Sequence, residues 1–145
     1  EVALWIIDKE NKRVLLQRRS PNKKLNPNKL ALCAGHVVGN ETIEEALAKE
    51  SLEELGLYLN KYKVGKLAVI KREEPSNYCF SHHFYIFENK PANCYKIQEE
   101  ELSEVLYVDY EVFKQMMKEE NDQVAYKWHT GEYDKLFKEL DKIMK

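Results

Sequence analysis

The segment at residues 35–57 constrains the fold more than any other part of the chain. Its sequence, GHVVGNETIEEALAKESLEELGL, carries six acidic side chains and one lysine. Thr42 is a suitable N-cap, and Glu45, three residues later, completes a capping box. Gly56 is the residue type that commonly ends a helix in the left-handed conformation. We therefore predict a helix that follows Thr42 and runs to about Leu55, with a loop before it.

Three acids of this predicted helix share one face. Glu50, Glu53 and Glu54 are spaced i, i+3 and i+4, which places their side chains within about 100° of arc. Like charges at this spacing repel by roughly 0.2–0.5 kcal/mol per pair, and burial raises the cost. A divalent cation such as Mg²⁺ would relieve the conflict, because carboxylate oxygens are its preferred ligands. The same arc includes apolar residues that we expect to face a core, Ile43, Ala46 and Leu47.

The whole chain has the composition of one soluble globular domain, residues 1–145. Hydrophobic residues make up 43% and charged residues 33% of its 145 positions. The net charge of −2 predicts no general attraction to nucleic acid or to an anionic membrane. No apolar run approaches the ~18–20 residues of a membrane span, and no secretory signal is visible. Three cysteines without a CxxC pair predict reduced thiols in a cytoplasmic protein.

A basic segment precedes the acidic one. Residues 18–29 contain five cations, and the prolines and asparagines of residues 20–30 predict a loop. One interpretation is a solvated basic loop. The other is a clamp for phosphate oxygens, because Arg and Lys bind such groups. On the second interpretation Arg18, Arg19 and Lys24 are candidate substrate-binding residues.

The remaining pattern predicts strands and helices intermixed along the chain. We expect strands at residues 2–7, 14–17, 30–33, 62–71, 78–87 and 104–109, and helices at residues 110–119 and 132–144. The composition of residues 72–77 predicts a turn. A mixed sheet flanked by helices is the architecture that fits this order. Substrate specificity is expected to come from the loops at residues 20–30, 72–77 and 89–98.

The acidic segment resembles the Nudix box. That motif is a glycine, five residues, a glutamate, seven residues, and then Arg-Glu-apolar-any-Glu-Glu-any-Gly-apolar. The chain has Lys49 in place of the arginine and Ser51 in place of the first apolar residue. The positions that match are Gly35, Glu41, Glu50, Glu53, Glu54, Gly56 and Leu57.

This resemblance implies an α/β/α sandwich in which a mixed sheet lies between helices. It also implies hydrolysis of a diphosphate bond in a nucleoside diphosphate linked to another group, or in a related organic diphosphate. Mg²⁺, or alternatively Mn²⁺, would be held by Glu50, Glu53 and Glu54, with Glu53 and Glu54 also counted as catalytic. The expected partner is a small-molecule diphosphate, and a homodimer is left open.

The segment before the box resembles that of isopentenyl-diphosphate isomerase and its Nudix relatives. In the isomerases a cysteine directly precedes the Gly-His pair, whereas here Ala34 does and Cys33 lies one residue earlier. One residue along a strand moves a side chain to the opposite face. The isomerases also lack the paired glutamates of this box. The sequence therefore resembles isomerase-like Nudix hydrolases more than the isomerase. The positions that carry this resemblance are Arg18, Arg19, Lys23, Lys24, Pro27, Cys33, Ala34, Gly35 and His36.

The general base and the substrate contacts are less constrained. Glu54 is one candidate base, and the run at residues 99–101 is another, with Glu101 our choice within it. His36 is a candidate contact to phosphate or a structural residue, and Tyr78 is a candidate for stacking or for the core. Two alternatives to the hydrolase stay open, an isomerase that uses Cys33 and a non-catalytic module that senses a nucleotide.

Overall fold

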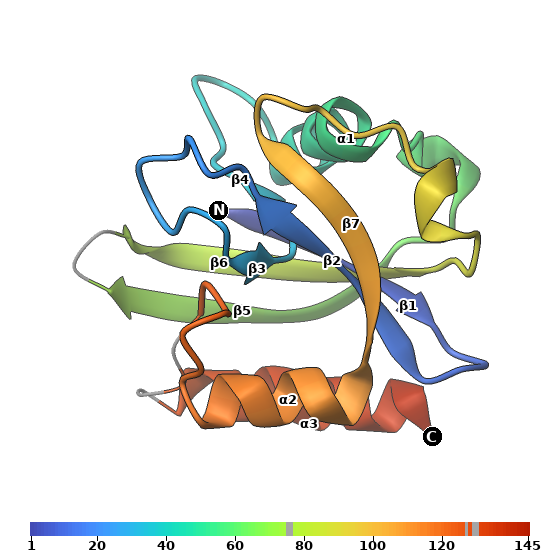
Figure 1. Ribbon diagram of the computed structural model, residues 1–145, viewed down its shortest axis with the longest axis vertical. Coiled ribbons are helices and arrows are strands. Elements are labelled where there is room, and N and C mark those ends of the chain that lie inside the picture. The colour runs from blue at the N-terminus through green and yellow to red at the C-terminus, as the bar shows by residue number, and fades with distance from the viewer. Residues whose placement is uncertain (75–76, 127, 129–130) are drawn as a thin grey trace.

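A seven-stranded sheet with helices on both faces forms the body of the protein (Figure 1). The computed structural model describes the chain except residues 75–76, 127 and 129–130 and the side chains of residues 74, 77 and 78. The strands are β1 (Val2–Asp8), β2 (Arg13–Arg19), β3 (Leu30–Ala31), β4 (Cys33–Gly35), β5 (Gly65–Glu74), β6 (Asn77–Phe87) and β7 (Leu102–Asp109). The helices are α1 (Ile43–Leu55), α2 (Tyr110–Lys118) and α3 (Glu132–Met144), with short 3₁₀ turns at Leu59–Lys61 and Ala92–Cys94.

The sheet is mixed, as the sequence predicts. Its main path is β3-β2-β1-β6-β5, while β4 pairs with β1 and β7 pairs with β2. The β1/β6 pair is parallel and the other ladders are antiparallel. Helix α1 covers one face of the sheet, and α2 and α3 cover the other (Figure 1). The predicted sandwich of a sheet between helices is thereby confirmed. Within the described residues, no helix is long and apolar enough to cross a membrane.

Strand β1 lies at the centre and separates two cores. Every residue of it is buried, which explains its unbroken apolar sequence. Ala3, Trp5 and Ile7 pack in the core beneath α2 and α3. The alternate residues, such as Leu4 and Ile6, pack in the core beneath α1. The period of two along one strand therefore supplies both layers of the sandwich.

The strand predicted at residues 30–33 is two strands with different partners. Leu30 and Ala31 pair with β2, whereas β4 pairs with β1. The chain changes partner at Leu32, which is buried and whose N–H donates to the Tyr126 hydroxyl at 2.8 Å. This change of partner brings Gly35 opposite Val2, beside the centre of the sheet.

The turn predicted at residues 72–77 is wrong at residues 72–74 and at residue 77, which belong to strands, and residues 75–76 lie outside the described residues. Strand β5 continues to Glu74, and Arg72 pairs with Cys79 across the ladder to β6. Arg72 is 8% exposed, and its Nη1 donates to both carboxylate oxygens of Glu1 at 2.9 and 3.0 Å. Pairing with β6 and this buried ion pair override the turn-forming composition. A cleft residue therefore lies where the sequence predicts a loop.

His83 is a buried histidine that belongs to the structure of the sheet. Trp5 Nε1 donates to His83 Nδ1 at 2.9 Å, and His83 Nε2 lies 3.1 Å from Ser81 Oγ. Because indole can only donate, Nδ1 is the acceptor and Nε2 carries the proton. Burial lowers the pKa of His83 to about 3. The protein therefore holds this imidazole neutral.

We expect this imidazole to make stability fall in mild acid. Its folded pKa lies below its unfolded value near 6.5, so its contribution is complete above pH 6.5 and is lost as the pH falls toward 3. The loss should approach about 1.4 kcal/mol per pH unit in that window. Denaturant unfolding of His83→Gln between pH 7 and 4.5 should show a shallower loss than wild type. The control is His82→Gln, at the adjacent half-buried histidine, which should keep most of the wild-type slope of unfolding free energy against pH. Equal slopes for His83→Gln and wild type would contradict the assignment of a neutral His83.

Candidate active site

Helix α1 carries the acidic face, and both of its ends are fixed as predicted. Thr42 Oγ1 accepts from the Glu45 N–H at 3.1 Å, and the Glu45 carboxylate accepts from the Thr42 N–H at 3.2 Å. Gly56 adopts φ 68°, and its N–H donates to the Leu52 carbonyl at 3.0 Å. Ala46 and Leu47 face the core, as expected. The caps fix the ends of the helix, and the packing of Ala46 and Leu47 sets the direction in which its acids point.

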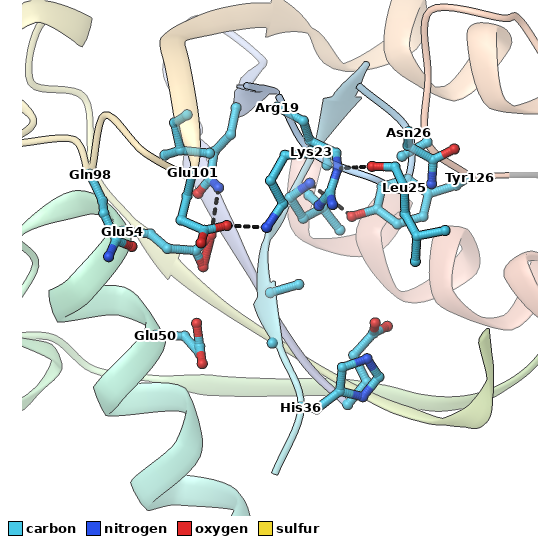
Figure 2. Close-up of a pocket in the computed structure, with 18 of the residues that line it drawn as sticks. Arg19, Lys23, Leu25, Asn26, His36, Glu50, Glu54, Gln98, Glu101 and Tyr126 are labelled. Carbon is cyan, nitrogen blue, oxygen red and sulfur yellow. Dashed lines mark hydrogen bonds and ion pairs between the residues drawn. The ribbon is translucent and has the colours of Figure 1, made fainter. Parts of the chain in front are cut away.

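The acids face a cleft of about 440 Å³ (Figure 2). One side of the cleft is the acidic face of α1, and the other comes from the basic loop and the ends of the central strands. Six of the residues predicted for the site line this cleft together: Arg19, His36, Glu50, Glu53, Glu54 and Glu101. Segments from residues 19 to 101 thus converge on one place.

Gly35 allows Glu50 to approach the sheet. A Cβ built on Gly35 would lie 2.3 Å from Cδ of Glu50 and 2.5 Å from its Oε1. Real Cβ atoms do not approach other heavy atoms so closely, so any other residue here would displace the carboxylate. The glycine that opens the acidic segment is therefore a steric requirement of the first acid in the cluster.

Glu54 is the most buried of the three acids, at 8% exposed. Gln17 Nε2 donates to its Oε1 at 2.9 Å, and Cys33 Sγ lies 3.8 Å from its Oε2. Burial, followed by the charge of Glu50, raises the pKa of Glu54 to about 9. Burial and the charge of Glu53 also raise the pKa of Glu50. Three ionised carboxylates here would therefore carry more negative charge than their surroundings compensate.

These residues fit a divalent cation of the Mg²⁺ type. The donors Glu50, Glu53 and Glu54 are all carboxylates, which suits Mg²⁺ or Mn²⁺ rather than a soft metal. Within the part of the chain that the structure describes, Oε1 of Gln17 is buried beside Glu54 without a hydrogen-bond partner. Such an acceptor is usually satisfied by bound water, and Mg²⁺ keeps several waters when it binds protein.

The two departures from the Nudix box are accommodated locally. Lys49 Nζ lies 3.0 Å from the Glu41 carboxylate and 4.0 Å from Oε1 of Glu50. The pKa of Glu41 is lowered by the Val38 N–H and then by Lys49. Ser51 is fully buried and donates through Oγ to the Leu47 carbonyl at 2.8 Å. Lysine therefore still orders Glu41, and the serine is satisfied by its own helix.

The basic loop closes the cleft opposite the acids. Arg19 Nε donates to the Leu25 carbonyl at 3.0 Å, so this arginine shapes the loop as it lines the cleft. Lys23 extends across the cleft and pairs with Glu101 (Figure 2). The Ser20 N–H donates to the Glu101 carbonyl at 2.9 Å. The basic loop is thus bonded to Glu101, the last residue of the acidic run, and the Lys23 ammonium lies close to the acids of the cleft.

Two predicted substrate-binding residues, Arg18 and Lys24, are placed outside the cleft, and a third, Tyr78, stays untested. Arg18 does not line the cleft, because its guanidinium donates to Glu104 at 3.0 Å and to the Asn28 carbonyl at 2.9 Å. Lys24 is exposed outside the lining. The side chain of Tyr78 lies outside the described residues.

The sequence predictions missed several polar lining residues, among them Gln17, Lys23, Arg72 and Tyr126. Lys23 had a signal, since it is adjacent to Lys24 in the same basic run. Arg72 was hidden by a turn-like composition. Gln17 and Tyr126 carry no local signal, because only long-range pairing brings them to the cleft.

The contact between Gly35 and Glu50 yields a test of the cluster. We expect Gly35→Ala to weaken Mg²⁺ binding at least about tenfold, because the new methyl group displaces a carboxylate ligand. Its free energy of unfolding should change by only about 1 kcal/mol. Isothermal titration with Mg²⁺ and denaturant unfolding measure the two quantities.

The matched control is Gly39→Ala. Gly39 has φ 57°, and among the described residues a Cβ added to it would meet no heavy atom within 4 Å beyond its chain neighbours. The substitution strains the backbone by about 1–2 kcal/mol without touching the cluster. It should therefore lower stability and leave Mg²⁺ affinity unchanged. Wild-type Mg²⁺ affinity in Gly35→Ala would contradict this account of the cluster.

Comparison with known proteins agrees with this geometry. The chain is 30% identical over 150 residues to Nudix hydrolase 3 of Arabidopsis thaliana, covering 94% of this chain and 19% of that protein. It is 35% identical over 71 residues to a prenyl-diphosphate phosphatase of Methanosarcina mazei, covering 49% of this chain and 41% of that protein. The chain thus spans less than half the length of either relative.

The structure resembles the NUDIX domain of Shewanella oneidensis NrtR complexed with ADP ribose, with a TM-score of 0.63. The two sequences are 14% identical, and the match covers 97% of this chain and 85% of that one.

The model of one domain family covers most of the chain. The NUDIX domain model matches residues 1–129, which include the acidic helix, the basic loop and every lining residue of the cleft. The chain belongs to the NUDIX domain family.

Proposed function

We propose that this chain is a Mg²⁺-dependent hydrolase that cleaves the diphosphate bond of a small molecule in which diphosphate is attached to an organic group. One observation carries the proposal. Three carboxylates converge in the cleft at an uncompensated cost, and Arg19 and Lys23 lie across from them. A metal-bound diphosphate needs carboxylates that bind its metal ion and basic side chains that bind its phosphate oxygens, and this cleft contains both.

The lining residues of the cleft would have separate roles in binding the cation and the phosphate. Glu50, Glu53 and Glu54 would hold the cation, which supplies charge neutralisation and lowers the pKa of a bound water. Arg19 and Lys23 bind phosphate oxygens on the opposite side. When a phosphate oxygen pairs with the Lys23 ammonium, the Glu101 carboxylate loses its ion-pair partner.

Glu101 then lies in the cleft as an acceptor for a proton. Water adds to phosphorus, the bridging P–O bond breaks, and the water proton passes to a carboxylate. Glu54 is the other candidate acceptor. Glu101 is favoured because Glu54 is already engaged by Gln17 and Cys33.

The position of Cys33 supports a hydrolase over an isomerase. Cys33 is 2% exposed, packs in the core beneath α1 and is absent from the cleft lining, which includes Ala34 instead. Burial, and then the charge of Glu54, raises the pKa of this thiol. A buried protonated thiol is poorly suited to proton transfer on a substrate in the cleft.

Two of the similar proteins guide the choice of substrate. One is a prenyl-diphosphate phosphatase and the other is a domain complexed with ADP ribose, and both of these ligands carry a diphosphate on an organic group. We propose the same chemical class here. The test is a panel with Mg²⁺ of prenyl diphosphates, nucleoside diphosphate sugars including ADP-ribose, dinucleoside polyphosphates and nucleoside triphosphates, with products read by phosphorus NMR.

We expect Glu53→Gln and Glu54→Gln each to lower turnover by about 10²-fold or more, because each removes a ligand charge that the reaction uses. Glu54→Gln should also raise the metal-free stability at pH 8, because a carboxyl with a folded pKa of about 9 must take up a proton on folding and glutamine removes that cost. The control Glu44→Gln, on the first turn of α1 and outside this cleft, should keep the wild-type rate.

Three outcomes separate the hypotheses. Wild-type turnover in both glutamine variants would overturn the mechanism. Allylic isomerisation of isopentenyl diphosphate that is lost in Cys33→Ala would favour the isomerase. Tight binding without turnover across the whole panel would favour a sensor module.

A further inference from the structure

A second cluster of metal-ligand atoms lies away from the acidic helix. The carboxylate of Glu1, the imidazole of His36 and the thiol of Cys79 each offer one ligand atom, and these atoms all lie within 4.8 Å of one another. We propose that these three residues form a second cation site, which takes a Zn²⁺-type ion and is chemically distinct from the carboxylate site on α1.

Sheet register brings the three residues together. Val2 is paired with Gly35 in the antiparallel β1/β4 ladder, so the preceding Glu1 lies opposite the following His36. The Glu1 carbonyl accepts from the His82 N–H at 2.8 Å, and the Glu1 nitrogen donates to the Phe80 carbonyl at 3.0 Å. These bonds align Glu1 with the stretch of β6 that carries Cys79. The positions of the three residues are therefore fixed by backbone pairing at the ends of strands β1, β4 and β6.

The donor set differs in kind from that of α1. One carboxylate oxygen, one imidazole nitrogen and one thiolate sulfur are ligands of Zn²⁺ and related borderline-soft ions, whereas the acids of α1 offer oxygen only. A tetrahedral Zn²⁺ site spaces its ligands by about 3.4–3.8 Å. The three ligand atoms, all within 4.8 Å of one another, are close to this spacing before any ion binds.

Neighbouring groups already hold the carboxylate in place. Arg72 donates to both oxygens of Glu1, and Ser81 Oγ donates to its Oε1 at 2.9 Å. Ligating carboxylates are usually oriented by such outer hydrogen bonds.

The site would face the cleft from the side opposite the acids. Glu1, His36 and Arg72 all line the cleft, and Figure 2 shows His36 apart from Glu50 and Glu54. Three protein ligands leave a fourth position, as in zinc sites that accept water or substrate. We assign that position to a water or to an oxyanion of the molecule in the cleft. Binding displaces the Cys79 thiol proton to solvent.

Cobalt spectroscopy tests the assignment directly. The full chain is titrated with Co²⁺ while excess Mg²⁺ keeps the carboxylate site filled. We expect a near-ultraviolet thiolate-to-cobalt charge-transfer band that saturates at one equivalent. The band should be absent in Cys79→Ser, and His36→Ala should weaken Co²⁺ binding at least about tenfold.

The other two cysteines are the matched controls. Cys94 is exposed on the Ala92–Cys94 turn, and Cys33 lies beside Glu54. Both Cys94→Ser and Cys33→Ser should keep the band, with folding checked by circular dichroism. No band in wild type, a band that survives in Cys79→Ser, or a band lost in Cys33→Ser would overturn the proposal.

Two further measurements keep this proposal separate from the hydrolase. With excess Mg²⁺ present to fill the carboxylate site, Zn²⁺ should raise the midpoint of thermal unfolding of wild type and not that of Cys79→Ser. Glu53→Gln, which removes a proposed Mg²⁺ ligand, should keep the cobalt band at full intensity. Loss of the band in Glu53→Gln would place the ion on α1 and overturn the second site, whatever the hydrolysis assays show.

Discussion

Crowding of three carboxylates against the sheet is the constraint on which the rest of the site depends. Glu50, Glu53 and Glu54 occupy one face of a capped helix, and that helix also buries apolar residues, so the acids cannot turn away from the protein. The Glu50 carboxylate then occupies the space that a side chain at position 35 would fill, which only Gly35 leaves open. The result is a cluster whose repulsion a cation would relieve, with Arg19 and Lys23 opposite it to receive anionic oxygens.

Sequence reasoning succeeded where structure is local. The Thr42 and Glu45 capping box and the Gly56 stop define α1 within a few residues of chain, so its ends and its acidic face follow from spacing alone. It failed where placement depends on partners far along the chain. Arg72 enters the cleft because β5 pairs with β6 beyond the expected turn, and Lys23 rather than Lys24 points inward because the loop is tied to Glu101.

The cleft has two chemically different ends. The α1 end offers oxygen ligands with high charge, and the end at Glu1 and His36 offers a mixed set anchored by strand register. The central strand β1 connects them, since it packs against α1 on one face and starts at the second cluster. A molecule that spans the cleft would thus meet the carboxylates of α1 at one end and the Glu1 carboxylate with the His36 imidazole at the other.

The dependence of stability on Mg²⁺ tests the central claim most directly. If the acids of α1 are held together at a cost that a cation removes, Mg²⁺ at about 100 times its dissociation constant should raise the free energy of unfolding by about 2.7 kcal/mol. The gain should vanish in the double variant Glu50→Gln/Glu54→Gln. An unfolding free energy that does not respond to Mg²⁺, or that rises equally in the double variant, would contradict the account.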